Sequence, residues 1–199
     1  MPSARVTSAE FEQYLAEAQV LAVDAITTFA LFCFLTSPKQ KTKYAEALAK
    51  HNQVFSLISP AAFSMLILSL HKPLEDARNP VSIRSCISMA LQLSRISRDT
   101  ARSLKGRVKK VVPIWEKVDV LRNSLIAHRD CGISVSKVFE NANISPKDLK
   151  ELALAYWEVL NALRAANKKS AFDVNVCGTH LFGALNSFMT DLLYAAKRR

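Results

Sequence analysis

The first long segment of the chain, residues 7–35, repeats apolar side chains at the three- and four-residue steps of an α-helix. Thr7 or Ser8 supplies a polar N-cap. After Phe29 the segment becomes apolar on every side, and a helix of that kind is buried on every side. Pro38 ends the pattern. The segment therefore predicts a central helix against which the remainder of the chain packs.

The composition extends this helical prediction to the whole chain. Only 4 of 199 residues are glycine, and 50% are hydrophobic, which is ample for one core. Sandwiches and other architectures that are rich in tight turns need more glycine. We therefore expect an all-α fold, a bundle of six to seven helices that forms one domain over residues 1–199.

Proline residues mark the other expected helix starts. Pro60 separates the two helices that follow the first one, and Pro113 begins the helix that carries the motif described below. Ser145 precedes a proline and has Asp148 three residues later, which is typical of a capped helix start. Residues 133–144 are expected to connect helices, with a short strand at most.

The net charge favours a polyanionic partner. Lys and Arg number 27 against 17 Asp and Glu, which gives +10 and fits RNA binding through phosphate neutralisation. Candidate backbone contacts are Arg102, Lys105, Lys109, Lys110 and Arg129. The alternative for the stretch from 102 to 110 is an ordinary solvated helix face.

Three residues near the end of the helix after Pro113 form a candidate catalytic set: Arg122, Asn123 and His128. Attack of a ribose 2′-oxygen on the adjacent phosphate needs a base and an acid, and histidine titrates in the right range for either. A guanidinium suits the negative charge that gathers on the phosphorane oxygens. The amide of Asn123 orients the imidazole or binds a phosphate oxygen.

The spacing of these residues indicates how they converge. Arg122 and His128 lie about 9 Å apart along a helix and about 120° apart around it. They therefore do not stack on one face. A second copy of the helix would bring two Arg–His sets into one groove, so that a homodimer is the expected assembly.

The sequence from Trp115 to Asp130 resembles that of the HEPN superfamily (higher eukaryotes and prokaryotes nucleotide-binding domains), and most of all that of its abortive-infection branch. The HEPN motif is an arginine, usually followed by a polar residue, then about four to six residues to a histidine. Here Arg122, Asn123 and His128 match it. In some toxin members a tyrosine two positions after the histidine is adenylylated, but this chain has Asp130 there.

The resemblance implies a homodimeric, metal-independent endoribonuclease of a toxin–antitoxin or phage-defence system. RNA would be its substrate, and an antitoxin protein a further partner. A different class of function is a non-catalytic module of the same fold that binds RNA, a nucleotide or a protein. A third is a purely structural helical protein, in which Arg122 pairs with Asp119 and His128 is a satisfied core histidine.

The remaining chemistry-bearing residues predict no further site. The cysteines are widely scattered, which argues against zinc and disulfides. We expect no metal and no cofactor. His51, His71 and His180 have no evident partner of catalytic type and are interpreted as structural. The most apolar runs are shorter than a bilayer span, so that we expect a cytoplasmic protein without a membrane partner.

Overall fold

The structure is a computed structural model, and it describes residues 6–75, 81–127, 135–171 and 173–197. These residues form nine α-helices and no strand, which confirms the all-α prediction but exceeds the six to seven helices expected. The helices are α1 (Ser8–Thr36), α2 (Pro38–Lys43), α3 (Ala45–Lys50), α4 (Asn52–His71), α5 (Ile83–Gln92), α6 (Arg98–Ala127), α7 (Val135–Ala142), α8 (Pro146–Ala166) and α9 (Val174–Lys197), with a 3₁₀ turn, η1, at Lys72–Leu74.

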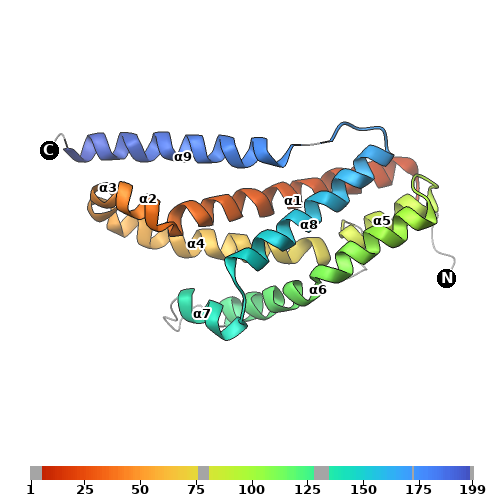
Figure 1. Cartoon of the computed structure of the whole chain (residues 1–199), viewed down its shortest axis with the longest axis horizontal. Coiled ribbons are helices and arrows are strands. Elements are labelled where there is room, and N and C mark those ends of the chain that lie inside the picture. The colour runs from red at the N-terminus through yellow and green to blue at the C-terminus, as the bar shows by residue number, and fades with distance from the viewer. Residues whose placement is uncertain (1–5, 76–80, 128–134, 172, 198–199) are drawn as a thin grey trace.

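Helix α1 is the central element that its sequence predicts, but the expected burial on every side after Phe29 was wrong, because Leu31, Cys33 and Leu35 are only partly buried. It runs along the long axis of the molecule, with α9 beside it and α8 crossing it (Figure 1). Its start is a capping box: Thr7 accepts a hydrogen bond from the Glu10 backbone, and the Glu10 carboxylate accepts one from the Thr7 backbone. The helix ends at Thr36, before Pro38, as predicted.

The two internal prolines do not begin helices, so that prediction was wrong. Pro60 lies inside α4 and Pro113 lies inside α6, which is one continuous helix. A proline frees the carbonyl four residues earlier. Both prolines and the residues four positions before them, Ser56 and Lys109, are exposed. Water can therefore bond the freed carbonyls, which lowers the cost of continuing the helix.

The additional helices come from breaks without a proline or glycine signal. The predicted second helix is divided at Tyr44 and His51 into α2, α3 and the first turns of α4. Residues 135–142 form α7 rather than the expected connector or strand. Further along, Ser145 and Asp148 form the predicted capping box at the start of α8.

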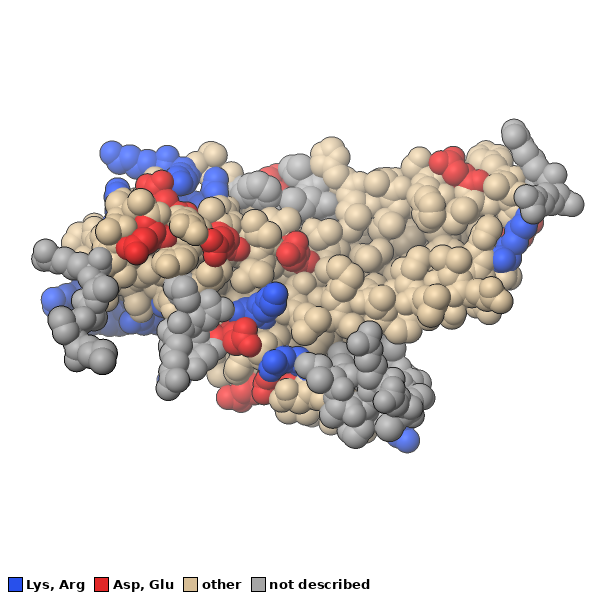
Figure 2. Space-filling view, turned by 180° about the vertical axis from the view of Figure 1, so that it is seen from behind, with Lys and Arg blue, Asp and Glu red and all other residues tan. Residues whose placement is uncertain are grey.

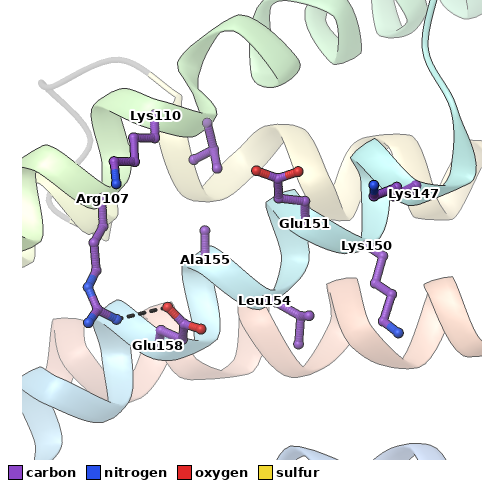
Figure 3. Close-up of a pocket in the computed structure, with 9 residues that line it drawn as sticks. Arg107, Lys110, Lys147, Lys150, Glu151, Leu154, Ala155 and Glu158 are labelled. Carbon is purple, nitrogen blue, oxygen red and sulfur yellow. Dashed lines mark hydrogen bonds and ion pairs between the residues drawn. The ribbon is translucent and has the colours of Figure 1, made fainter.

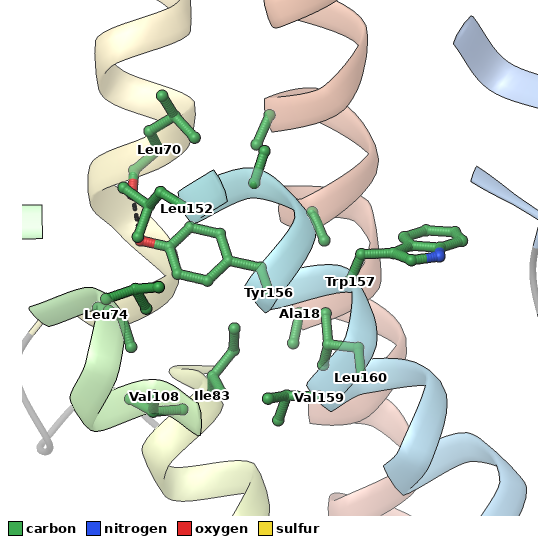
Figure 4. Packing of buried hydrophobic residues seen from close by; sticks show 14 of the residues in the cluster. Ala18, Leu70, Leu74, Ile83, Val108, Leu152, Tyr156, Trp157, Val159 and Leu160 are labelled. Atoms are coloured by element: carbon green, nitrogen blue, oxygen red, sulfur yellow. Dashed lines mark hydrogen bonds between the residues drawn. The ribbon is translucent and has the colours of Figure 1, made fainter. Parts of the chain in front are cut away.

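Helices α1, α4, α5, α6 and α8 share the main core. Tyr156 of α8 lies at its centre, and its hydroxyl donates a 2.7 Å hydrogen bond to the Leu70 carbonyl of α4 (Figure 4). Leu70 lies in the last turn of α4, where carbonyls lack α-helical partners. Tyr156 therefore fastens the end of α4 to α8.

A second, smaller core joins α9 to the α1–α3 end of the molecule. Phe34, Tyr44, Ala47 and Met189 are buried together there. The Tyr44 hydroxyl donates a 2.9 Å hydrogen bond to the Asn186 side chain of α9.

Two segments, Ser8–Thr36 and Asn52–Leu74, are long and apolar enough to cross a membrane by length and composition. The expectation that the apolar segments are shorter than a bilayer span was wrong, because each helix continues beyond its most apolar residues. In each, 39% of the apolar window is buried inside the structure. Because core helices of soluble proteins pass the same test of length and composition, the test does not decide for or against a membrane, and the absence of a membrane partner stays a prediction.

Candidate functional site

Two of the three predicted catalytic residues lie among the described residues. Arg122 and Asn123 are on the last turns of α6, with Arg122 half-buried and Asn123 exposed. His128 and Arg129 lie outside the described residues. The structure therefore positions the arginine and the amide of the motif, and the convergence of Arg122 with His128 stays a prediction.

Asp119 connects the described part of the motif. Its Oδ1 lies 3.6 Å from Arg122 Nη1, which is the i,i+3 ion pair considered for the structural alternative. Its Oδ2 accepts a 3.3 Å hydrogen bond from Asn123 Nδ2, one helical turn away. Trp115, Asp119, Arg122 and Asn123 share one face of α6, because three- and four-residue steps return to the same side of a helix.

The same carboxylate contacts a histidine from another helix. This histidine is His71, the last residue of α4, and its Nε2 atom lies 2.9 Å from Asp119 Oδ1. A carboxylate offers only acceptor oxygens, so His71 donates from Nε2. Its Nδ1 is 4.0 Å from Glu75 Oε1, beyond hydrogen-bond distance. The interpretation of His71 as a histidine without a partner of catalytic type was therefore wrong.

His71 is held on several sides. Its residue is only 4% exposed. The ring stacks on Trp115 with centroids 5.2 Å apart, and the Trp115 indole donates a 2.9 Å hydrogen bond to the His71 carbonyl. Trp115 and Tyr156 thus bond consecutive carbonyls, those of His71 and Leu70, in the last turn of α4. The end of α4 is fixed against α6 and α8 as a result.

The predicted RNA-backbone contacts are spread over exposed faces of α6. Arg102 pairs with Asp99 at 3.1 Å, and both side chains are largely exposed. Lys105, Lys109 and Lys110 are exposed as well. Of these four residues, Lys110 alone contributes to the basic groove described next.

A groove of about 730 Å³ lies between α6 and α8. Its cationic lining residues are Arg107, Lys110, Lys147 and Lys150, and its acidic ones are Glu151 and Glu158. Figure 3 shows Arg107 reaching across the groove to Glu158, with which it forms a 2.8 Å ion pair. The sequence could not reveal this groove, because residues that face each other in it, such as Arg107 and Glu158, are 51 residues apart along the chain.

The cysteines that the structure describes are free thiols. Cys33 is partly exposed and Cys86 is buried. Burial raises the pKa of both thiols, and raises that of Cys86 to about 12. Cys131 lies outside the described residues, and nothing is described of the side chain of Cys177. Within the described ranges, no group of three or more His, Cys, Asp or Glu residues is placed to hold a metal ion.

Comparison with known proteins identifies a family. No curated protein and no solved structure matches the chain significantly. The sequence profile of the AbiU2 family, HEPN_AbiU2, matches residues 8–186, nearly the whole of the 199-residue chain. The match includes every helix from α1 to α8 and the Arg122–His128 motif. The chain therefore belongs to the HEPN_AbiU2 family, a family of HEPN-type abortive-infection domains.

Proposed function

We propose that this protein is a metal-independent endoribonuclease of a toxin–antitoxin or phage-defence system, which cleaves RNA at an Arg–His site in a homodimer. One observation carries the proposal: the Arg122 side chain is 31% exposed and at the same time forms an ion pair with Asp119 at 3.6 Å. A guanidinium that is both oriented and open to solvent can contact a phosphate without a large rearrangement. The family match supports the same conclusion.

In this proposal each motif residue has a separate role. Arg122 stabilises the negative charge of the phosphorane, since a guanidinium stays charged and donates along a planar edge. His128 transfers a proton, either from the attacking 2′-oxygen or to the leaving 5′-oxygen. Asn123 is exposed beside Arg122 and can donate to a phosphate oxygen. Cleavage then leaves a 2′,3′-cyclic phosphate.

The proposed dimer is supported by an exposed apolar stripe along α4. Its members recur at three- and four-residue steps, except that Leu57 and Ile58 are adjacent, and the stripe ends three residues before His71. Its residues are Val54, Leu57, Ile58, Ala61, Met65 and Leu68. Figure 2 views the molecule from the side opposite to Figure 1, and a broad area of this face carries few charges. A surface with few charges and an apolar stripe can pack against the same surface of a second copy of the chain, as a twofold dimer requires.

The remaining partners belong to the same proposal. RNA is the substrate, an antitoxin protein restrains the activity, and the protein acts in the cytoplasm without metal, cofactor or membrane. The net charge of +10 supports an RNA substrate.

Expression in a bacterial host tests the proposal. Wild type and the control His180→Ala, which changes an exposed histidine on α9, should slow growth and fragment cellular RNA. Arg122→Ala and His128→Ala should do neither. Equal growth with intact RNA in all four strains would contradict the proposal.

A second candidate is a non-catalytic RNA-binding module, and the α6–α8 groove favours it. Arg107 is fifteen residues from Arg122, or about 22 Å along α6. The groove could therefore bind a phosphate backbone without the motif. RNA binding by wild type that persists in His128→Ala, with no cleavage by either, would select this function.

A further inference from the structure

The geometry points to His71 and Asp119 as positioning residues for Arg122, so that the catalytic site is built from α4 as well as from the motif helix. This inference rests on the proposed ribonuclease function. Neither residue belongs to the Arg–His motif, and His71 is 48 residues from Asp119 in sequence.

Asp119 is the centre of the arrangement. Oδ1 accepts from His71 at 2.9 Å and faces Arg122 at 3.6 Å, and Oδ2 accepts from Asn123 at 3.3 Å. Both carboxylate oxygens are thus used. The carboxylate cannot turn toward solvent without losing the hydrogen bond to His71, and its direction fixes where the Arg122 guanidinium is attracted.

The His71 side chain is buried, whereas both members of the Asp119–Arg122 ion pair are partly exposed. The exposed fraction of the side chain is 5% for His71, 35% for Asp119 and 31% for Arg122. An exposed i,i+3 ion pair alone is weak and mobile. Here the acidic partner is bonded to a buried imidazole, which Trp115 fixes by ring stacking and by its hydrogen bond to the His71 carbonyl. The rigidity of the core is therefore transmitted to a side chain at the surface.

This arrangement suits the task proposed for Arg122. A guanidinium has five N–H donors, and contact through Nη1 leaves the others available for phosphate oxygens. Charge stabilisation in a transition state requires donors that are held in place before the reaction, because reorientation would consume part of the benefit. The His71–Asp119 pair supplies that restraint without touching RNA.

The first measurement needs no RNA. Relaxation of the arginine side-chain ¹⁵Nε nuclei reports the order of each guanidinium, and the signal of Arg122 is assigned by its loss in Arg122→Lys. The order of Arg122 should fall in His71→Leu and Asp119→Ala. It should be retained in His71→Gln, whose amide nitrogen can replace Nε2 as the donor. Glu116→Ala, which removes an exposed carboxylate from the same helix, is the matched control and should also retain it.

The second measurement is RNA cleavage by the same variants. Asp119→Ala and His71→Leu should lower kcat by about tenfold to a hundredfold, the range known for supporting residues in other active sites. KM should change less than kcat, since the transition state depends most on the guanidinium. His71→Gln should restore most of the activity. Thermal unfolding identifies any variant that fails to fold, and Asp119→Ala, at a partly exposed position, tests the inference if His71→Leu does not fold.

The outcomes separate this inference from the proposed function. Unchanged order of Arg122 in Asp119→Ala and His71→Leu overturns the positioning role, whatever the cleavage assays give. Reduced order in these variants, rescued in His71→Gln, supports it. If wild type then cleaves no RNA, the proposed ribonuclease function fails while the positioning of Arg122 by His71 and Asp119 stands.

Discussion

Replacing Tyr156 by phenylalanine tests how firmly the end of α4 is fixed. The change removes one hydroxyl, which donates a 2.7 Å hydrogen bond to the Leu70 carbonyl. Tyr156 is 1% exposed, and burial raises the pKa of its phenol well above the usual value, so that the group remains a protonated donor. The ring itself stays in the core.

The expected loss of stability follows from the lost hydrogen bond. A typical intramolecular hydrogen bond contributes about 0.5–1.5 kcal/mol, and a buried acceptor left without its partner costs about 1–3 kcal/mol. We therefore expect Tyr156→Phe to lower the free energy of unfolding by about 1–2 kcal/mol. With an unfolding entropy of about 2.1 cal/mol/K per residue, a chain of this length should lose about 2–5 °C in Tm.

Urea unfolding and thermal unfolding, both followed by circular dichroism, measure the change. The m-value should stay constant, because the exposed surface on unfolding is nearly the same. Tyr194→Phe is the control: Tyr194 is 64% exposed on α9, and its loss of a hydroxyl should leave the stability unchanged. A Tyr156→Phe protein as stable as Tyr194→Phe would refute the argument that this bond fastens α4.

Three further predictions concern other parts of the chain. With its pKa raised to about 12, the Cys86 thiol should react with a thiol reagent at pH 8 only after denaturant is added; labelling in native buffer would contradict its burial. Ser145→Ala should cost about 1 kcal/mol through the lost cap of α8. The hydrogen bonds from Ser145 lower the pKa of Asp148, so this carboxylate stabilises the fold above its unfolded pKa, and the contribution is lost as pH falls through its folded pKa. The difference in unfolding free energy between Ser145→Ala and wild type, measured by urea titration, should therefore shrink toward acid pH. A difference that does not change with pH would argue against the capping box. Lys110→Ala and Lys147→Ala should each weaken RNA binding and reduce the slope of log affinity against log salt by about 0.7–0.9, measured by fluorescence anisotropy; unchanged slopes would exclude the groove as a backbone contact.

Local signals in the sequence were sufficient for much of the fold. The capping residues Thr7 and Ser145 each act within one helical turn, and the structure confirms both. The apolar period of α1 predicted its burial, since Phe11 and Leu15 lie at 0% and 1% exposure. These features depend only on neighbouring residues, which is why a pattern in the chain reveals them.

Features that depend on other helices were not predictable in the same way. Pro60 and Pro113 are tolerated inside helices because of where each residue meets solvent, and this depends on packing. The His71–Asp119 contact requires the end of α4 to lie against α6 across 48 residues of chain. The motif identified Arg122, but no local pattern in the sequence indicates that the buried His71 contacts Asp119, the ion-pair partner of Arg122.

Cleavage of a defined RNA by the purified protein in the presence of EDTA tests the central claim most directly. We expect wild type to release products that end in a 2′,3′-cyclic phosphate, and to leave intact a substrate with 2′-deoxyribose at the cleaved position. Arg122→Ala should be slower by about a hundredfold to a thousandfold, as for the loss of a charge-stabilising donor in other enzymes. Cleavage that proceeds equally well in Arg122→Ala and His128→Ala, or no cleavage by wild type, would contradict the account.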